Sequence, residues 1–573
     1  MKYHRQEPLR HVGDVPAMGA DRYGEKLALE YRGEAYSYAD LEARSNRVAN
    51  ALVEAGIDPG DRVALFLENS LQFPESFFGV IEAGAVAVPL NHRMDVGRLR
   101  YILDDAGAAA LITSPVFPSV GAELAAEVPL AFVPGGESVI DGLEDYDEHV
   151  DRASPAFDRP DRSFDDVAVQ CYTSGTTGDP KGVLTTHRNL LSTVQSYTSR
   201  SGADPEDDVA LCFLPLFHMY GLSVVLLLGL YNGSTIVLRT MPVPSELLSA
   251  ITEFGVTSFA GIPAVYVEML AEIERNPDAY DVSSIETLGS GAAPLAEDTR
   301  RRIEAAFDTP LTEGWGMTET SPAGTTSSTY GVRKGAGCIG QPLPDVEIKL
   351  VDPETRETRV PAAALDPTSA TTLEDHGINP DDEAQVTGEI AIRGPQVFAG
   401  YHELPEKNAE VFDGWEAPRA SDRSSGERSD PRDYGWFYTS DIARVDPDRF
   451  LWMVDRADDM LIVGGENVYP AEVEDALFDH PDVQSAAVVG APHEVKGEAP
   501  VAFVVLEPGV EEQPTERELR EFTLERVPTY AHPRRVFVVD ELPRSGTQKV
   551  QRYKLEEEVE ERLAEPLQPS EEL

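Results

Sequence analysis

Cysteine is scarce in this chain of 573 residues. Its three cysteines, Cys171, Cys212 and Cys338, form no CxxC pair, and their number is odd. Both facts argue against a disulfide framework. We therefore expect a protein of a reducing compartment and place it in the cytoplasm.

Basic residues are few, and lysine is the scarcest of the charged residues. The chain has 101 aspartates and glutamates but only 48 lysines and arginines, of which nine are lysines, and its formal net charge is −53. A surface of this charge repels nucleic-acid phosphates and anionic lipids, which argues against nucleic-acid binding. Because salt screens such self-repulsion, the acid excess indicates a halophilic protein. A specific cationic partner is the alternative.

Long apolar runs are absent as well. The longest, residues 222–231, covers about ten residues, roughly half of what a bilayer requires. It predicts a buried core helix, and no transmembrane segment is expected. Residues 1–16 are polar and lack the apolar stretch of a signal peptide. The sequence leaves the oligomeric state open.

The sequence does contain an alternation of strand-like and helix-like segments, which is typical of an α/β protein. The length exceeds one ordinary hydrophobic core, so at least two domains are expected. We predict a large N-terminal domain of layered sheets and helices at residues 1–455, a hinge at 456–458 and a small α/β domain at 459–573. Strands are predicted at residues 63–67, 109–113, 234–238, 257–260, 486–489, 501–506 and 536–539, and helices at 38–55, 245–254, 516–526 and from Pro470 onward.

Two segments are predicted to be surface insertions without regular structure. Residues 361–383 are acidic and rich in Pro, Thr and Asp, and residues 417–433 are rich in charges and turn-forming residues. Neither segment has an apolar periodicity, so both are expected to be mobile loops.

The strongest local pattern is a loop rich in glycine and hydroxyl residues. Residues 172–182 read YTSGTTGDPKG and follow a strand-like apolar segment at 167–171. Backbone N–H groups and hydroxyls in such a loop can converge on an anion, and Lys181 adds a positive charge for a phosphate. A Walker A loop would need GxxxxGK followed by Ser or Thr, and this segment lacks that order. A flexible linker is the alternative, which the position beside a strand disfavours.

This loop resembles the phosphate-binding signature of the adenylate-forming superfamily, which comprises acyl-CoA synthetases, peptide-synthetase adenylation domains and beetle luciferases. The resemblance extends from about residue 23 to residue 555, and it is closest to fatty acyl-CoA ligases. Each further motif alone would fit an ordinary turn or core residue, but their joint occurrence in family order does not. These motifs are LPLFHMYG at 214–221, GSGAAP at 289–294, GWGMTET at 314–320, YTSD at 438–441, DRADDMLIVGGENVYP at 455–470 and PRSGTQKV at 543–550.

The resemblance implies ATP, Mg²⁺ and coenzyme A as cofactors. Trp315 would face adenine, Asp441 would bind the ribose hydroxyls, and Gly464 and Gly465 would border the pantetheine arm of CoA. Glu319 would be the metal ligand, as a hard oxygen donor for Mg²⁺. The residues implied in nucleotide and CoA binding are Thr173, Ser174, Gly175, Thr176, Thr177, Gly178, Lys181, Gly291, Ala292, Ala293, Trp315, Gly316, Met317, Asp441, Arg456, Gly464 and Gly465.

The catalytic residues implied by the resemblance are Lys549, Thr318, Glu319 and His218. Lys549 would neutralise charge between the carboxylate and the α-phosphate, and Asp458 matches the hinge residue about which a mobile C-terminal domain turns. The substrate pocket would include His218, Tyr220 and Gly291, with a core histidine as the alternative for His218. Small residues at Gly229, Gly261 and Gly291 would suit a deep acyl tunnel. Ser440 and Gln548 stand where the family usually has glycine.

The implied function is an AMP-forming acyl-CoA ligase, which activates a carboxylic acid as an acyl-adenylate and transfers it to CoA. The expected acid is a medium- or long-chain fatty acid. An aryl acid such as 4-coumarate is the alternative, because phenylpropanoid ligases carry a similar Phe-His-x-Tyr. An adenylating enzyme with another acceptor is a further alternative, as is an inactive adenylate-binding protein.

Overall fold

A computed structural model describes the chain in two compact units. The first unit comprises the described residues up to Glu347 together with Ile392–Phe437, and the second comprises Ile348–Ala391 and the described residues from Tyr438 onward. The predicted boundary at 456–458 lies within the sequence of the second unit, and the hinge stays a prediction. The described residues are 9–135, 143–173, 180–199, 207–291, 295, 297–327, 334–413, 435–456, 459–463, 466–493, 497–510, 513–544 and 550–563.

The first unit contains a seven-stranded sheet. All neighbouring strands in it are parallel except the last two, β8 and β9. The strand order is β7 (Glu144–Asp145), β6 (Leu130–Val133), β5 (Ala108–Thr113), β3 (Arg62–Phe66), β4 (Val86–Pro89), β8 (Val167–Thr173) and β9 (Lys181–Thr186). The helices in this stretch of chain are α1 (Asp14–Tyr23), α2 (Tyr38–Glu54), α3 (Gln72–Glu82), α4 (Val96–Ala106), α5 (Pro118–Ala125), α6 (Tyr146–Arg152) and α7 (His187–Thr198).

A second set of strands in the first unit carries most of the predicted nucleotide motifs. Its middle strands are parallel, and antiparallel pairs lie at both ends. The order is β16 (Cys338–Pro342), β15 (Thr325–Thr326), β14 (Leu311–Trp315), β13 (Thr287–Ser290), β12 (Ser258–Gly261), β10 (Val209–Cys212), β11 (Thr235–Leu238), β1 (Leu27–Tyr31) and β2 (Glu34–Ser37). The helices here are η2 (Tyr220–Leu227), α8 (Leu228–Asn232), α9 (Pro244–Phe254), α10 (Pro263–Arg275), α11 (Glu297–Phe307), η3 (Thr318–Thr320) and α14 (Pro405–Val411).

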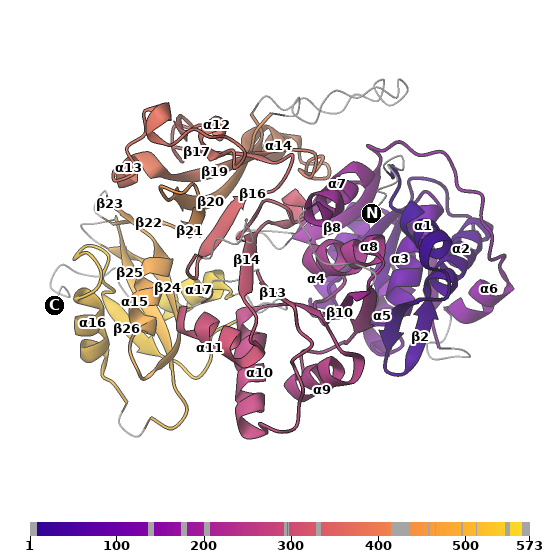
Figure 1. Cartoon of the computed structure of the whole chain (residues 1–573), viewed down its shortest axis with the longest axis horizontal. Coiled ribbons are helices and arrows are strands. Elements are labelled where there is room, and N and C mark those ends of the chain that lie inside the picture. The colour runs from indigo at the N-terminus through magenta and orange to yellow at the C-terminus, as the bar shows by residue number, and fades with distance from the viewer. Residues whose placement is uncertain are drawn as a thin grey trace. The chain divides into compact units, whose positions relative to one another are not determined.

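The second unit holds two groups of strands. One has the order β18 (Thr358–Val360), β17 (Glu347–Val351), β19 (Thr387–Arg393), β20 (Phe437–Val445) and β21 (Leu451–Arg456). The other has the order β23 (Glu466–Val468), β22 (Leu461–Val463), β25 (Gly497–Leu506) and β24 (Val483–His493), with β26 (Arg535–Val538) also beside β25. Helices α15 (Pro470–Phe478), α16 (Glu516–Leu524) and α17 (Arg552–Arg562) surround this second group (Figure 1).

Local sequence signals explain where these elements begin. In α2, Ser37 and Asp40 form a capping box, and Leu41, Val48 and Leu52 bury one face at helical spacing. Strand β4 is buried on both faces, as expected for a central parallel strand. The predicted α/β class is confirmed, and most predicted segments match observed elements to within two residues.

Two predictions about apolar or irregular segments need correction. The run at 222–231 is buried and helical as expected, but most of it lies in the π-helix η2, which begins at Tyr220. Residues 361–383 are not an irregular loop, because they contain the short helices α12 (Ala362–Leu365) and η4 (Glu374–His376) and bury Leu365 and Leu373 completely. Residues 417–433 lie outside the described residues. In the described part of the chain, no helix has the length and apolar character to cross a membrane.

Candidate active site

The predicted phosphate loop connects two paired strands. Thr173 ends β8 and Lys181 begins β9, and these two residues face each other in the antiparallel ladder. Tyr172 and Gly182 form the next pair. The hairpin thus brings both ends of the loop together. Outside the described residues lie Ser174, Gly175, Thr176, Thr177 and Gly178.

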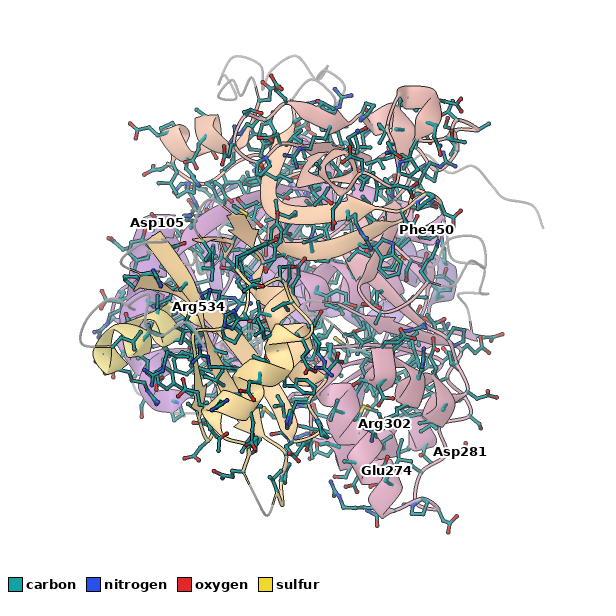
Figure 2. All side chains as sticks on the ribbon, turned by 90° about the vertical axis from the view of Figure 1, so that its left-hand side faces the viewer. Asp105, Glu274, Asp281, Arg302, Phe450 and Arg534 are labelled. Carbon is teal, nitrogen blue, oxygen red and sulfur yellow. The ribbon has the colours of Figure 1, made fainter. Side chains whose placement is uncertain are left out.

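Polar contacts fix the base of this hairpin. The Tyr172 hydroxyl donates a hydrogen bond to the Asp105 carboxylate at 2.6 Å and accepts one from the Gln170 amide at 2.8 Å. The His402 backbone N–H donates to the Gly182 carbonyl at 2.7 Å. Burial and the bond to Asp105 raise the pKa of Tyr172. Asp105, labelled in Figure 2, lies near the end of α4, and no local pattern in the sequence marked it.

Tyr401 connects the phosphate-binding lysine with the predicted metal ligand. The Lys181 ammonium lies 5.9 Å from the centre of the Tyr401 ring, within the range of a cation–π contact. The Tyr401 hydroxyl donates a hydrogen bond to Glu319 Oε1 at 2.9 Å. The structure therefore brings together two residues that are far apart in the sequence. Sequence reasoning missed Tyr401, because it lies in no recognised motif.

The surroundings of Glu319 fit a magnesium ligand. Magnesium in phosphate-transfer sites binds one or two carboxylates and completes its shell with substrate phosphate and water. Glu319 is 5% exposed, and one of its oxygens is oriented by the Tyr401 hydroxyl. Among the described residues no group of three or more His, Cys, Asp or Glu is arranged to hold a metal ion. The phosphates of a bound nucleotide would complete such a site.

Strand β14 ends at the predicted adenine-facing residue, Trp315. Its indole is 7% exposed and packs against Gly324, where an added Cβ would lie 2.4 Å from the ring. At Gly316 a Cβ would lie 2.4 Å from the carbonyl oxygen of Pro322. The two glycines therefore allow the chain to turn closely around the indole, which forms part of a packed wall.

The residues after this strand form a tight turn. Met317 immediately precedes η3, which carries Thr318 and Glu319. The Met317 N–H donates to the Thr320 hydroxyl at 3.0 Å, which closes the turn. This short helix places Thr318 and Glu319 just beyond the carboxyl end of β14. Ligands of α/β proteins commonly bind at that edge of a sheet.

The predicted pocket residues Tyr220 and Gly291 lie together. A Cβ on Gly291 would lie 3.5 Å from the Tyr220 ring. Burial raises the pKa of the Tyr220 phenol to about 12. The Tyr266 hydroxyl donates to the carbonyl of Gly289, two residues before Gly291. The wall here is aromatic, and the Tyr220 hydroxyl lies beside Gly291. Ala292 and Ala293 are not among the described residues.

Two of the glycines expected to open a deep tunnel do not do so. A Cβ on Gly229 would lie 2.4 Å from Ile236 Cδ1, and one on Gly261 would lie 2.8 Å from the Tyr266 ring. Neighbouring side chains already fill the space, so this expectation is wrong for Gly229 and Gly261.

The segment before His218 is held by a buried asparagine that sequence reasoning missed. The Asn69 amide donates to the carbonyl of Leu214 at 2.9 Å and accepts from the N–H of Leu216 at 2.9 Å. His218 Nδ1 lies 3.3 Å from the backbone nitrogen of Tyr220. The His218 and Tyr220 positions are thus tied to one another through the local backbone.

The predicted ribose-binding residue lies on β20. Asp441 is 8% exposed and pairs with Arg456 of β21 in the antiparallel ladder. The preceding Ser440 has a φ of 61°, a left-handed conformation that favours glycine. Its N–H donates to Glu389 at 2.8 Å, which compensates part of the strain. Serine at this position thus adopts a backbone conformation that glycine adopts more readily.

The remaining predicted residues lie outside the described part of the chain. Asp458 follows β21, and Gly464 and Gly465 stand between β22 and β23, whose residues Val463 and Glu466 are paired. Lys549 and Gln548 precede Val550. Their roles stay predictions.

Comparison with known proteins decides the family. The model of the AMP-binding enzyme family matches residues 17–402, and that of the AMP-binding enzyme C-terminal domain matches residues 472–549. The chain belongs to the AMP-binding enzyme family. The predicted adenylate-forming superfamily and acyl-CoA ligase class are confirmed.

Relatives within the AMP-binding enzyme family cover nearly the whole chain. A feruloyl-CoA synthase of Amycolatopsis sp is 34% identical, over 94% of this chain and 97% of its own length. A long-chain-fatty-acid–CoA ligase of Bacillus subtilis (strain 168) is 30% identical, over 96% and 95%. The solved structure of the anthranilate CoA ligase AuaEII with anthranoyl-AMP has a TM-score of 0.82 at 27% identity, covering 99% of this chain and 100% of that one. The large N-terminal and small C-terminal parts of this AMP-binding enzyme therefore follow the family architecture.

Proposed function

We propose that the chain is an ATP-dependent, AMP-forming acyl-CoA ligase with its phosphate site around Lys181, Tyr401 and Glu319. One observation carries this proposal. The Tyr401 side chain contacts both the lysine of the phosphate loop and the carboxylate suited to magnesium. A cation and a metal-binding carboxylate that contact the same tyrosine suit a triphosphate.

In the first half-reaction, a carboxylate oxygen of the acid attacks the α-phosphorus of ATP. The bond to the bridging oxygen breaks, and pyrophosphate leaves with the electron pair. We assign residues 174–178 and Lys181 to the phosphates, Thr318 to the α-phosphate and Lys549 to the developing charge. No protein nucleophile is needed, because positioning and charge neutralisation lower the barrier.

The nucleotide is held by further assigned residues. Asp441 would bind the ribose, Arg456 would contact the nucleotide, and Trp315 would border the adenine. Glu319 would hold Mg²⁺, which neutralises phosphate charge when bound. Residues 291–293 and 316–317 would form the rest of the adenine wall.

In the second half-reaction, the CoA thiolate attacks the carbonyl carbon of the acyl-adenylate, and AMP leaves. We assign Gly464 and Gly465 to the pantetheine arm, because a side chain there would narrow its path. His218 borders the same acyl group. The C-terminal domain would turn about Asp458 between the two half-reactions.

For the acid, we propose a planar aryl acid with a distal hydroxyl, of the hydroxycinnamate type. The support is the aromatic wall of Tyr220 against Gly291, with a half-buried phenol that has no hydrogen-bond partner among the described residues. A hydroxyl of this kind, at the edge of an apolar wall, stabilises a ligand that hydrogen-bonds to it. Relatives named feruloyl-CoA synthase and 4-coumarate–CoA ligase support the same class.

A medium- or long-chain fatty acid is the second candidate. It is supported by the Bacillus subtilis long-chain-fatty-acid–CoA ligase, which matches 96% of this chain. The two candidates differ in the depth of pocket they need. The filled space at Gly229 and Gly261 favours the shorter aryl acid.

Pyrophosphate release tests the activity and the acid together. Wild type is assayed at high salt with acetate, octanoate, palmitate, benzoate and 4-coumarate, with and without CoA. We expect release with 4-coumarate, and acyl-CoA product only with CoA. Lys549→Ala should reduce release to a small residual rate, whereas Lys554→Ala, at an exposed lysine five residues later, should leave it unchanged. Undiminished release in Lys549→Ala would contradict the mechanism, and a preference for palmitate would establish the second candidate.

The Tyr220 hydroxyl gives a sharper test of the acid. Tyr220→Phe keeps the ring against Gly291 but removes the hydroxyl. We expect the KM for 4-coumarate to rise about tenfold, in line with about 1.5 kcal/mol for one lost buried hydrogen bond. The KM for cinnamate, which lacks the distal hydroxyl, should not change. An equal effect on both acids would contradict this role.

A further inference from the structure

A half-buried arginine lies close in sequence to the assigned catalytic lysine. Arg552 is the first residue of α17 and follows Lys549 by three positions. Its guanidinium forms a two-pronged ion pair with Glu474 of α15, with Nη1–Oε1 at 2.5 Å and Nη2–Oε2 at 3.2 Å. Nη1 also donates to the carbonyl of Val488 at 2.7 Å, and Nε lies 3.4 Å from Asp459.

The partners of Arg552 are themselves fixed. Glu474 Oε1 also accepts a hydrogen bond from the Val488 N–H at 2.7 Å, so one carboxylate binds α17 and β24 together. Burial would lower the pKa of Arg552, but Glu474, Asp459 and Asp455 outweigh burial and hold the pKa above its ordinary value. The cluster therefore keeps its charge, and a planar guanidinium held on two sides has little freedom to move.

The base of the lysine loop directly precedes Arg552 in the chain. Arg544 and Val550 pair in an antiparallel bridge, and the Gln551 N–H donates to the carbonyl of Pro543 at 2.8 Å. These contacts close the chain on either side of residues 545–549. The closed base leads directly into Arg552, whose guanidinium contacts Glu474 of α15 and Val488 of β24.

The cluster also reaches both sides of the predicted hinge. Asp459, which contacts Arg552, follows the hinge residues 456–458, and Asp455 precedes them. The Asp455 carboxylate accepts a hydrogen bond from the Ala471 N–H at 2.9 Å, in the first turn of α15. A carboxylate is stabilised at a helix N-terminus. Helix α15 thus connects the chain before the hinge with the base of the lysine loop.

We propose that Arg552 is a positioning residue for Lys549 in acyl-adenylate formation. The proposal rests on the proposed function, in which Lys549 acts in the first half-reaction only. Loss of the two-pronged contact frees the base of the loop, and a misplacement of about 1 Å can cost a reaction about 100-fold. Arg552 itself touches no substrate, and its effect passes through Lys549.

The half-reactions separate this role from a general structural one. Adenylation is measured as acid-dependent pyrophosphate release, and thiolation as acyl-CoA formation from chemically prepared acyl-adenylate. Arg552→Gln should lower the rate of adenylation 10- to 100-fold and leave thiolation within about twofold. Arg552→Lys should restore part of the loss, because an ammonium can keep one contact with Glu474. The control is Arg517→Gln on α16, which breaks an exposed pair with Glu521 and should change neither rate.

A double variant tests the connection to Lys549 directly. In the Lys549→Ala background, Arg552→Gln should cause no further loss of adenylation. An additive loss would overturn the proposal, as would an equal fall of both half-reactions in Arg552→Gln, which would indicate a structural role. Unchanged adenylation in Arg552→Gln beside an active wild type would overturn the proposal alone. A folded wild type that forms no adenylate with any acid would overturn the proposed function and the role of Arg552 with it.

Discussion

At the scale of single residues, one hydroxyl orients the carboxylate of the proposed metal site. Tyr401→Phe keeps the ring beside Lys181 but removes the hydrogen bond to Glu319. We expect adenylation to fall about tenfold and the Mg²⁺ concentration for half-maximal rate to rise, because partners of metal ligands are worth about 10- to 100-fold. The measurement is pyrophosphate release at a series of Mg²⁺ concentrations.

The chain offers a matched control for this change. Tyr280 also donates its hydroxyl to a glutamate, at 3.0 Å to Oε1 of Glu272 on α10, and neither residue belongs to a predicted motif. Tyr280→Phe should leave both the rate and the Mg²⁺ dependence unchanged. A similar effect of the two variants would contradict the role assigned to Tyr401.

A buried carboxyl near the N-terminus makes stability depend on pH. Burial raises the pKa of Glu82 to about 8. Between about pH 4.5 and 8 the folded state therefore keeps a proton that the unfolded chain has released, and stability falls as pH rises through this range. His11, which lies nearby, has the opposite effect on the pH dependence of stability. Burial lowers its pKa to about 4, so the folded state loses stability as the pH falls and the unfolded chain takes up a proton on this histidine.

Glu82→Gln isolates the contribution of this carboxyl. The amide cannot ionise, so the variant should gain stability over wild type by roughly 1.4 kcal/mol for each pH unit. From pH 5.5 to 7.5 the difference in the free energy of unfolding should shift by about 3 kcal/mol, measured by urea unfolding. Glu54→Gln, at an exposed position of α2, should show no shift. A constant difference between Glu82→Gln and wild type would contradict the assignment.

At the scale of elements, helices α2 and α3 approach each other at a glycine. A Cβ on Gly79 would lie 2.4 Å from Val48 Cβ and 3.0 Å from the Ser45 carbonyl. Gly79→Ala should therefore lower the free energy of unfolding by about 1–3 kcal/mol, the usual cost of overpacking. Thermal or urea unfolding measures the loss.

An exposed helical glycine provides the comparison. At Gly97 of α4, a Cβ would meet only the Asp95 carboxylate, at 3.1 Å. Gly97→Ala should change stability by less than about 1 kcal/mol, because helix propensity favours alanine and no backbone is displaced. Equal losses in the two variants would show that helix packing at Gly79 is not the cause.

At the scale of the whole molecule, the charge dominates. A formal net charge of −53 destabilises the folded chain through self-repulsion. Because the Debye length falls to about 3 Å at 1 M salt, we expect the melting temperature to rise markedly between 0.1 and 2 M KCl. Sucrose at equal osmolality should produce a smaller rise. A melting temperature that does not depend on KCl would contradict a halophilic surface.

Much of the fold could be predicted because its signals are local. The apolar spacing of residues 38–55 predicts α2, and the strand-like segment at 109–113 matches β5 within one residue. The π-helical form of 220–227 could not be predicted, since periodicity does not separate a fully buried π-helix from an α-helix. The helical structure within residues 361–383 was missed, because the isolated leucines Leu365 and Leu373 become buried only in the tertiary structure.

The sequence by itself determined the family, the α/β class and the order of the nucleotide motifs, because glycine-rich turns and apolar periodicity depend on neighbouring residues. Only the tertiary structure decided which distant residues meet. Tyr401 and Glu319 are separated by 82 positions, and Arg552 and Glu474 by 78. Such contacts depend on strand register and helix packing, which a local pattern does not specify. The contact between Gly291 and the Tyr220 ring is also tertiary, because the two residues come from different parts of the chain.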